Sequence, residues 1–311
     1  SDLSAVQIGH FAGDETLDVR KMATAIVTDS NCGIAVDEAE TLNIHIIPMP
    51  ILINEISFYE GLDISYSELL QHLMDKDHVT TSQPAPTDLE TMWDKLLESK
   101  YDDIIYIPMS SGLSSSYQTA CMLSKDYNGA VYVVDAHRIS VTQRHAVMDA
   151  VALKNQGFSA ASIKEILERN AFQSIIFVGV DDIEYLKRGG RLTPGAAAIA
   201  SVLNIKPLLT IQGEKIDSYA KMRGNKKCQK QLIKIMKEKS LDYLTQGRKL
   251  RIGITGSFSD EKDAKEWYLS AIQVFADAPL QYDPLTFSIT CHTGPNAFGM
   301  GISTYPEELC I

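Results

Sequence analysis

Short apolar runs recur along the first half of the chain, separated by stretches with helical spacing. Residues 23–28, 103–107 and 131–134 are rich in Ile, Val, Ala and Tyr. Runs of this kind are typical of strands buried on both faces of a parallel sheet. The pattern therefore predicts strand and helix alternation around a parallel sheet.

Helix starts are marked by Ser or Thr followed three residues later by Glu. This spacing occurs at residues 65–68, 87–90 and 162–165. It is typical of a capping box, in which the two side chains satisfy free N–H groups of the first turn. Apolar residues at helical spacing follow, so a helix is predicted after each signal.

A second, similar unit begins near Ser174, where residues 174–180 read as a buried strand after two consecutive helices over about 140–170. The remainder is predicted to contain a hairpin over 206–222 turning at 212–213, a helix ending near 245, a strand over 250–255, a helix ending near 275 and strands from 285 onward. The fold class is thus α/β with two lobes. Ligands favour the crevice between such lobes, at the carboxyl ends of strands.

The lobe boundaries follow from this pattern. Residues 22–172 are expected to form the N-terminal α/β lobe and residues 173–311 the C-terminal α/β lobe. Residues 1–21 lack the basic start and apolar stretch of a secretory signal, so we interpret them as a tag or extra segment. Met22 is the expected natural start.

Composition narrows the class of protein. With 40 acidic and 29 basic residues the net charge is −11, which disfavours nucleic acid as a partner. The five cysteines are scattered and form no CxxC pair, which argues against disulfides and zinc and indicates a cytoplasmic location. No apolar run approaches the roughly 20 residues of a membrane-spanning helix, so any membrane contact is expected to be transient.

Three loops are packed with small hydrogen-bond donors, at residues 80–86, 110–118 and 292–299. Hydroxyl and free N–H groups at a helix start can bind a carboxylate or phosphate. The serines of the second loop are equally compatible with simple helix capping. His292 follows an apolar run at 285–290 that we interpret as a strand, which would place the imidazole at a strand end.

A cationic segment at 181–194 contains Lys187, Arg188 and Arg191 around two glycines. A plain helix C-cap explains one glycine and the preceding charges. A cationic lip for an acidic partner or phosphate is the alternative. The next stretch, 195–203, is apolar on every side and is predicted to be buried, with ordinary helix packing favoured over an acyl-chain wall.

Together these segments resemble the DegV family of bacterial fatty-acid-binding proteins, from about Met22 to the C-terminus. The matching blocks are residues 26–30, 81–84, 110–114 with 117–118, 185–191, 206–209 with 223, and 292–295 with 299. Two departures concern local sequence: Ser-Ser-Ser-Tyr stands at 114–117 where the family often has Ser-Gly-Thr-Tyr, and Gly-Ile at 33–34 replaces Asp-Leu. Acyl specificity is therefore not transferred to this chain.

The resemblance implies a two-lobed fold with a fatty acid, such as palmitate, stearate or oleate, in a tunnel between the lobes. It implies a carboxylate site made by Thr81, Ser82, Ser110, Ser111, Gly112, Arg223 and His292, with supporting roles for Asp29, Ser30, Thr293 and Gly294. It further implies a carrier for phospholipid metabolism, without catalysis, metal or cofactor, that presents the acid to a fatty acid kinase. Lys187, Arg188 and Arg191 are the candidate docking residues.

Two other functions fit parts of the sequence. A serine-type acyl hydrolase would use Ser, His and Asp, but residues 112–116 lack the second glycine of a Gly-x-Ser-x-Gly elbow. A phosphotransferase-like small-molecule binder, similar to the sugar-binding domain of dihydroxyacetone kinases, would need a nucleotide site, and the sequence contains no P-loop.

Overall fold

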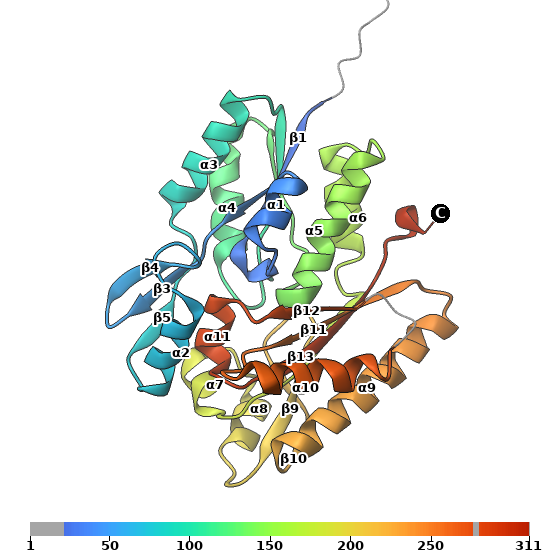
Figure 1. Ribbon diagram of the computed structural model, residues 1–311. Coiled ribbons are helices and arrows are strands. Elements are labelled where there is room, and N and C mark those ends of the chain that lie inside the picture. The colour runs from blue at the N-terminus through green and yellow to red at the C-terminus, as the bar shows by residue number, and fades with distance from the viewer. Residues whose placement is uncertain (1–21, 276–279, 311) are drawn as a thin grey trace, which may run out of the picture.

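The computed structural model describes residues 22–275 and 280–310, so the segment 1–21 lies outside the described residues. A parallel sheet with the strand order β2-β1-β6-β7 forms the centre of the first lobe, at the top of Figure 1. Its strands are β1 (Thr24–Asp29), β2 (Ile44–Ile47), β6 (Asp103–Ile107) and β7 (Val131–Val133). All residues of β1 and β6 are buried, as the apolar runs predict.

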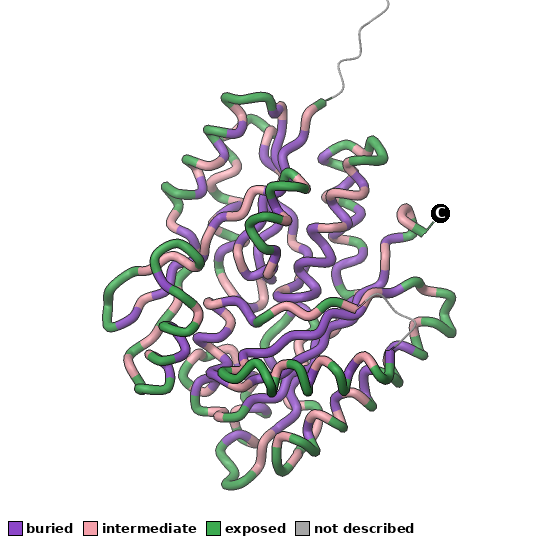
Figure 2. Tube along the Cα trace, in the orientation of Figure 1, coloured by how far each residue is buried: buried purple, intermediate pink, exposed green. Residues whose placement is uncertain are grey.

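Helices cover both faces of this sheet. They are α1 (Val36–Thr41), α3 (Pro86–Glu98), α4 (Ser116–Ser124), α5 (Ser140–Asn155) and α6 (Ala160–Arg169), with the short turn η1 (Ser30–Cys32) after β1. Trp93 of α3 is fully buried and packs edge-on against Tyr106 of β6. Figure 2 shows buried residues concentrated in the sheets and α5.

Only one of the three predicted capping boxes forms as expected. Ser65 and Glu68 cap α2 (Tyr66–Met74) reciprocally. The helix predicted to start at Thr87 begins at Pro86 instead, because proline suits the first helical position. The helix predicted from Ser162 begins at Ala160, where the Ser159 hydroxyl accepts from the Ser162 N–H.

A three-stranded antiparallel sheet extends from the first lobe. Its order is β4-β3-β5, with β3 (Pro50–Ile53), β4 (Ile56–Tyr59) and β5 (Val79–Thr81). The helix α2 lies between β4 and β5 in the sequence. The carboxyl end of β5 brings Thr81 next to the second lobe.

The second lobe is built on a six-stranded mixed sheet with the order β10-β9-β8-β13-β11-β12. The strands are β8 (Ser174–Gly179), β9 (Lys206–Ile211), β10 (Asp217–Met222), β11 (Leu250–Gly256), β12 (Leu280–Pro284) and β13 (Phe298–Thr304). The helices α9 (Asn225–Thr245) and α10 (Glu261–Ile272) pack on this sheet, and α5 of the first lobe contacts β11 and β13. The predicted hairpin over 206–222 is confirmed.

The run at 285–290 forms no strand, so that prediction was wrong. Residues Phe287–Thr293 form the helix α11. The sequence alternates apolar and polar residues, which favours a strand, but Leu285 and Ile289 also have helical spacing, and so short a run fits both patterns. His292 therefore lies in the last turn of a helix.

The apolar stretch 195–203 is also not buried all round. The helix α8 (Pro194–Ala200) buries Ala196 and Ala200 against β9 and β10, near the outer edge of the sheet. Beyond its end Val202 is 51% and Leu203 86% exposed. An edge position offers only one face for burial, which is why the prediction of complete burial was wrong.

Candidate functional site

A cavity lies between the two lobes. The space among its lining residues amounts to about 910 Å³, including open solvent at its mouth. Apolar side chains supply most of the wall. They are Met49, Met109, Leu113, Ile139, Ile176, Val178, Leu186, Ile211, Ile216, Leu285 and Ile289.

The first lobe contributes the carboxyl ends of its parallel strands. Asn31 follows β1, Met49 follows β2 and Met109 follows β6. Parallel strands present these ends at one edge of the sheet, where ligands bind in α/β folds. The second lobe contributes residues of β8, β9, β11 and β13, whose Gly299 also lines the cavity. The predicted crevice is thus a cavity with walls from both lobes.

One corner of this cavity is polar. The Thr81 hydroxyl on β5 and the His292 imidazole on α11 are hydrogen-bonded, with 2.7 Å between Oγ1 and Nε2. Burial, and after it the positive charge of Arg191, lowers the pKa of His292 to about 4. His292 is therefore neutral at pH 7 in this structure. We call Thr81, Arg191 and His292 the polar corner.

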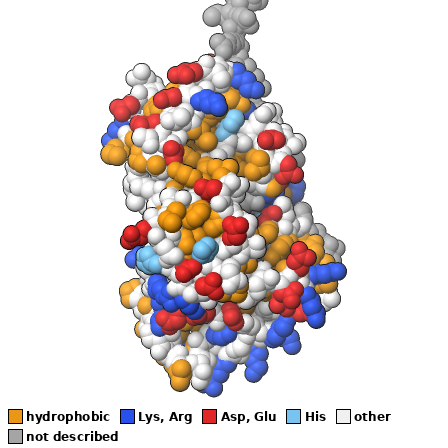
Figure 3. Space-filling view, turned by 60° about the vertical axis from the view of Figure 1, so that its left-hand side comes forward, with side chains coloured by type: hydrophobic (Ala, Val, Ile, Leu, Met, Phe, Trp, Pro, Cys, Tyr) orange, Lys and Arg blue, Asp and Glu red, His pale blue; other side chains and the backbone are white. Residues whose placement is uncertain are grey.

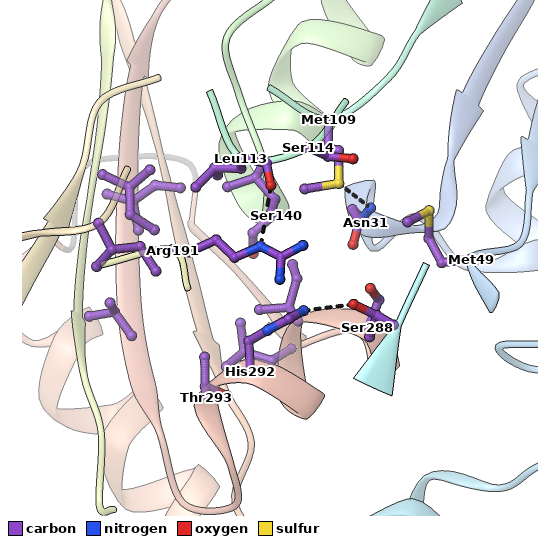
Figure 4. Close-up of a pocket in the computed structure, with 18 of the residues that line it drawn as sticks. Asn31, Met49, Met109, Leu113, Ser114, Ser140, Arg191, Ser288, His292 and Thr293 are labelled. Atoms are coloured by element: carbon purple, nitrogen blue, oxygen red, sulfur yellow. Dashed lines mark hydrogen bonds between the residues drawn. The ribbon is translucent and has the colours of Figure 1, made fainter. Parts of the chain in front are cut away.

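Arg191 extends into the cavity beside His292 (Figure 4). Its Nε donates to the Leu113 carbonyl at 3.3 Å and its Nη1 donates to the Gly189 carbonyl at 2.7 Å. Within residues 22–275 and 280–310, no carboxylate pairs with it. A half-buried guanidinium without an anion is a site for a carboxylate or phosphate.

The paired glycines before Arg191 have separate roles. Gly190 has φ +69° and ends the helix α7 (Glu184–Gly189) in the left-handed conformation that glycine adopts readily. A Cβ at Gly189 would lie 2.7 Å from Nδ1 of His292. The C-cap was expected at Gly189 and is at Gly190 instead, so Gly189 is the glycine that a cap does not explain, and it gives the imidazole its space.

The serine loop has a different geometry from the one expected of a binding loop. Ser110 is fully buried, donates to the Gly213 carbonyl and accepts from the Gly112 N–H. A Cβ at Gly112 would lie 2.5 Å from the Gly213 carbonyl oxygen. Neither Ser110, Ser111 nor Gly112 lines the cavity, whereas Ser114 of the same loop does. The loop holds the first lobe against the 213 turn of the second.

The other predicted contact residues lie in three places: the cavity wall, the protein surface and the buried end of α11. Ser82 and Thr293 line the cavity. Arg223 is exposed after β10 and lies outside the cavity lining. Gly294 ends α11 and approaches the Tyr185 ring.

A second cleft of about 1040 Å³, mouth included, adjoins the polar corner and shares its three residues. Lys76, His78 and Arg188 also line it. Lys187 instead pairs with Glu184 at 3.0 Å. Most of the Lys and Arg side chains on the face shown in Figure 3 lie in its lower half, over the second lobe.

Buried carboxylates hold the cavity wall from behind. Asp29 accepts hydrogen bonds from the backbone N–H groups of Asn31 and Met109. Ser30 donates to Glu60, and Glu60 also accepts from the Phe287 N–H at the start of α11. These bonds tie β1 to α11 outside the cavity, an arrangement that agrees with supporting roles for Asp29 and Ser30.

Asn31 and Met109 are among the cavity residues that the sequence left unassigned. Asn31 directly follows the Asp29-Ser30 motif, and its position after a parallel strand was the signal available. Met109 follows β6 in the same way.

No group of three or more potential ligands that could hold a metal ion occurs in the described ranges. None of the described helices is long and apolar enough to cross a membrane.

Comparisons with known proteins agree on one family. A family model described as "Uncharacterised protein, DegV family" matches residues 23–305. A DegV domain-containing protein of Deinococcus radiodurans is 28% identical over 284 residues, covering 90% of this chain and 98% of that protein. Most of the chain thus aligns with nearly the whole of that relative.

Two solved structures share the two-lobed fold, which confirms the predicted fold class. A fatty-acid-binding DegV family protein from Thermus thermophilus is 27% identical with a TM-score of 0.79, covering 91% of this chain and 100% of that one. DegV of Bacillus subtilis, a fatty acid binding protein, is 25% identical with a TM-score of 0.79, covering 91% and 99%.

Proposed function

Because this chain belongs to the DegV family, we propose that it binds one long-chain fatty acid between its lobes and presents the carboxylate to a separate fatty acid kinase. The observation that carries the proposal is an apolar cavity that ends in the polar corner of Thr81, Arg191 and His292. The fatty-acid-binding relatives from Thermus thermophilus and Bacillus subtilis support it.

The acyl chain supplies the affinity. Each buried methylene contributes about 0.8 kcal/mol, so a long tail along the Ile, Leu and Met wall outweighs the head group. Palmitate, stearate and oleate are the ligands we propose to test first. The structure assigns no preference among them.

The carboxylate belongs at the polar corner. Arg191 offers a positive charge that no described carboxylate neutralises, and Thr81, Ser82 and His292 offer hydrogen bonds nearby. A carboxylate removed from water needs such charge-assisted bonds. In this proposal Arg191 has the role that Arg223 was expected to share.

The geometry favours a fatty acid carrier over an ester hydrolase. Thr81 and His292 resemble a nucleophile and base in their spacing, but a general base works best with a pKa near the working pH, and that of His292 is about 4. Ser110, the serine at the start of the loop, is fully buried and bonded to a carbonyl. An esterase assay that yields ordinary turnover, lost in Thr81→Val, would favour the hydrolase.

The second cleft offers a route by which a kinase can reach the carboxylate. It opens on Thr81, Arg191 and His292 from the side of Arg188 and Lys76. A carboxylate oxygen would attack the γ-phosphorus of ATP held by the kinase, and the bond to the ADP oxygen would break. Arg188 and Lys187 remain the proposed docking residues.

All five cysteines are free, which supports the proposed cytoplasmic location.

Native mass spectrometry of the purified protein, followed by lipid extraction, tests the central claim. We expect one bound mass per chain that matches a fatty acid, or uptake of added palmitate by empty protein. Protein that stays empty with added acids refutes the proposal. For the kinase step, hydroxylamine should trap an acyl hydroxamate when a fatty acid kinase and ATP are present. Arg188→Glu should slow that reaction without weakening acid binding.

A further inference from the structure

Asn31 presents an unusual polar atom to the cavity. Its side chain is 1% exposed, and its Nδ2 donates to the Met109 sulfur at 3.2 Å. The same side chain also hydrogen-bonds Asp29. Burial raises the pKa of Asp29, and the hydrogen bonds from Asn31, Gln143 and backbone donors oppose that rise. These contacts fix the orientation of the amide, because only the nitrogen can donate to an acceptor.

The amide oxygen is left without a donor. In the part of the chain that the structure describes, Oδ1 of Asn31 is buried and has no hydrogen-bond partner. Figure 4 shows Asn31 across the cavity from Arg191, with its nitrogen toward Met109. Buried amide oxygens are nearly always paired, so an unpaired one that borders a ligand cavity points to a donor on the ligand.

A simple fatty acid cannot supply this donor. An ionised carboxylate only accepts hydrogen bonds, and methylenes have none to offer. A hydroxyl group can donate to Oδ1 of Asn31, and it is a small substituent that an acyl chain can carry.

We infer that the cavity accepts fatty acids carrying a hydroxyl group close to the carboxylate, with Asn31 as the residue that recognises it. Asn31 and Arg191 face the same part of the cavity, so a hydroxyl on carbon 2 or 3 fits an acid held by Arg191. This inference rests on the proposed fatty acid binding and specifies its substrate class.

The test compares dissociation constants of palmitic acid and of the separate enantiomers of 2- and 3-hydroxypalmitic acid. At least one hydroxy acid should bind roughly three- to tenfold more tightly than palmitic acid, the worth of one hydrogen bond. The Asn31→Leu variant should lose or reverse that preference, and it should still bind palmitic acid. Arg223→Ala, a change at an exposed residue outside the cavity lining, should keep the preference. Because the readout is a ratio, partial misfolding of a variant does not affect it.

Two outcomes would overturn the inference. If every hydroxy acid binds no better than palmitic acid, or Asn31→Leu leaves the ratio unchanged, Asn31 does not recognise a ligand hydroxyl, and fatty acid binding itself still stands. If neither palmitic acid nor any hydroxy acid binds, the proposed function fails together with the inference.

Discussion

The serine loop at 110–116 and the polar corner both carry hydroxyl groups, yet they use them differently. The hydroxyl of Ser110 is fully buried and joins the two lobes through the Gly213 carbonyl. Thr81 and Arg191 line the cavity, and Arg191 has no carboxylate partner in the described residues. The comparison teaches that a donor-rich sequence predicts binding only where the structure brings the donors to a cavity together with a charge that has no counterion.

The strongest test of this contrast removes the charge at the corner. Arg191→Met keeps much of the side-chain length and should weaken fatty acid binding roughly 30-fold or more, since losing one member of a buried charge pair costs about 2–5 kcal/mol. Isothermal titration calorimetry with palmitic acid and with hexadecanol measures this loss of affinity.

The alcohol and a distant arginine serve as controls. Hexadecanol carries no charge, so it should lose much less affinity than the acid. Arg223→Ala changes an exposed arginine outside the cavity and should leave binding within about twofold. Equal losses for acid and alcohol in Arg191→Met would mean that Arg191 maintains structure instead.

A second test concerns the buried carboxyl group of Glu60, which lies behind the polar corner. Burial raises the pKa of Glu60 from its ordinary 4.5 to about 7, although hydrogen bonds from Ser30 and Phe287 oppose the rise. The folded state therefore holds the proton more tightly than the unfolded chain does. As pH rises from about 5 to 8, this group should lower the free energy of unfolding by about 2.5 kcal/mol.

Glu60→Gln removes that titration and keeps an oxygen for the Phe287 N–H. Urea denaturation at pH 5, 6, 7 and 8 should show a flatter pH profile for the variant. The readout is the difference between the two proteins, because Asp29 and His292 titrate in both. A difference that does not change with pH would contradict the assignment.

The smallest effect is expected at the serine loop. Ser110→Ala leaves the Gly213 carbonyl and the Gly112 N–H without their partner, which should cost about 1–3 kcal/mol of stability. The ratio of affinities for palmitic acid and hexadecanol should not change. Ser111→Ala, in the same loop, should alter stability by less than about 0.5 kcal/mol. Selective loss of acid binding in either variant would place this loop back in the site.

The first lobe was the most predictable part of the fold. The runs at 23–28 and 103–107 are mostly apolar, with Thr24, Thr28 and Asp103 as the exceptions, and they form parallel strands in which every residue is buried. Such strands follow from local composition, because burial on both faces favours apolar residues at successive positions. The hairpin over 206–222 was equally clear, with a glycine at its turn.

The site was less predictable because it depends on contacts between distant residues. The run at 285–290 fits a strand or a helix by its spacing, and packing against α7 and the three-stranded sheet favours the helix α11. Arg191 follows a helix end that suggests a surface position. Its location in the cavity depends on the Leu113 carbonyl, 78 residues earlier. Domain boundaries at 172 and 173 stay a prediction.

The strand β13 lies between β8 and β11, although it comes after both of them, and after every other described strand, in sequence order. During synthesis the second sheet must therefore wait, with the edges of β8 and β11 uncovered, until residues 298–304 leave the ribosome. Open strand edges of this kind promote aggregation. Truncation before β13 should consequently produce insoluble protein rather than a smaller working domain.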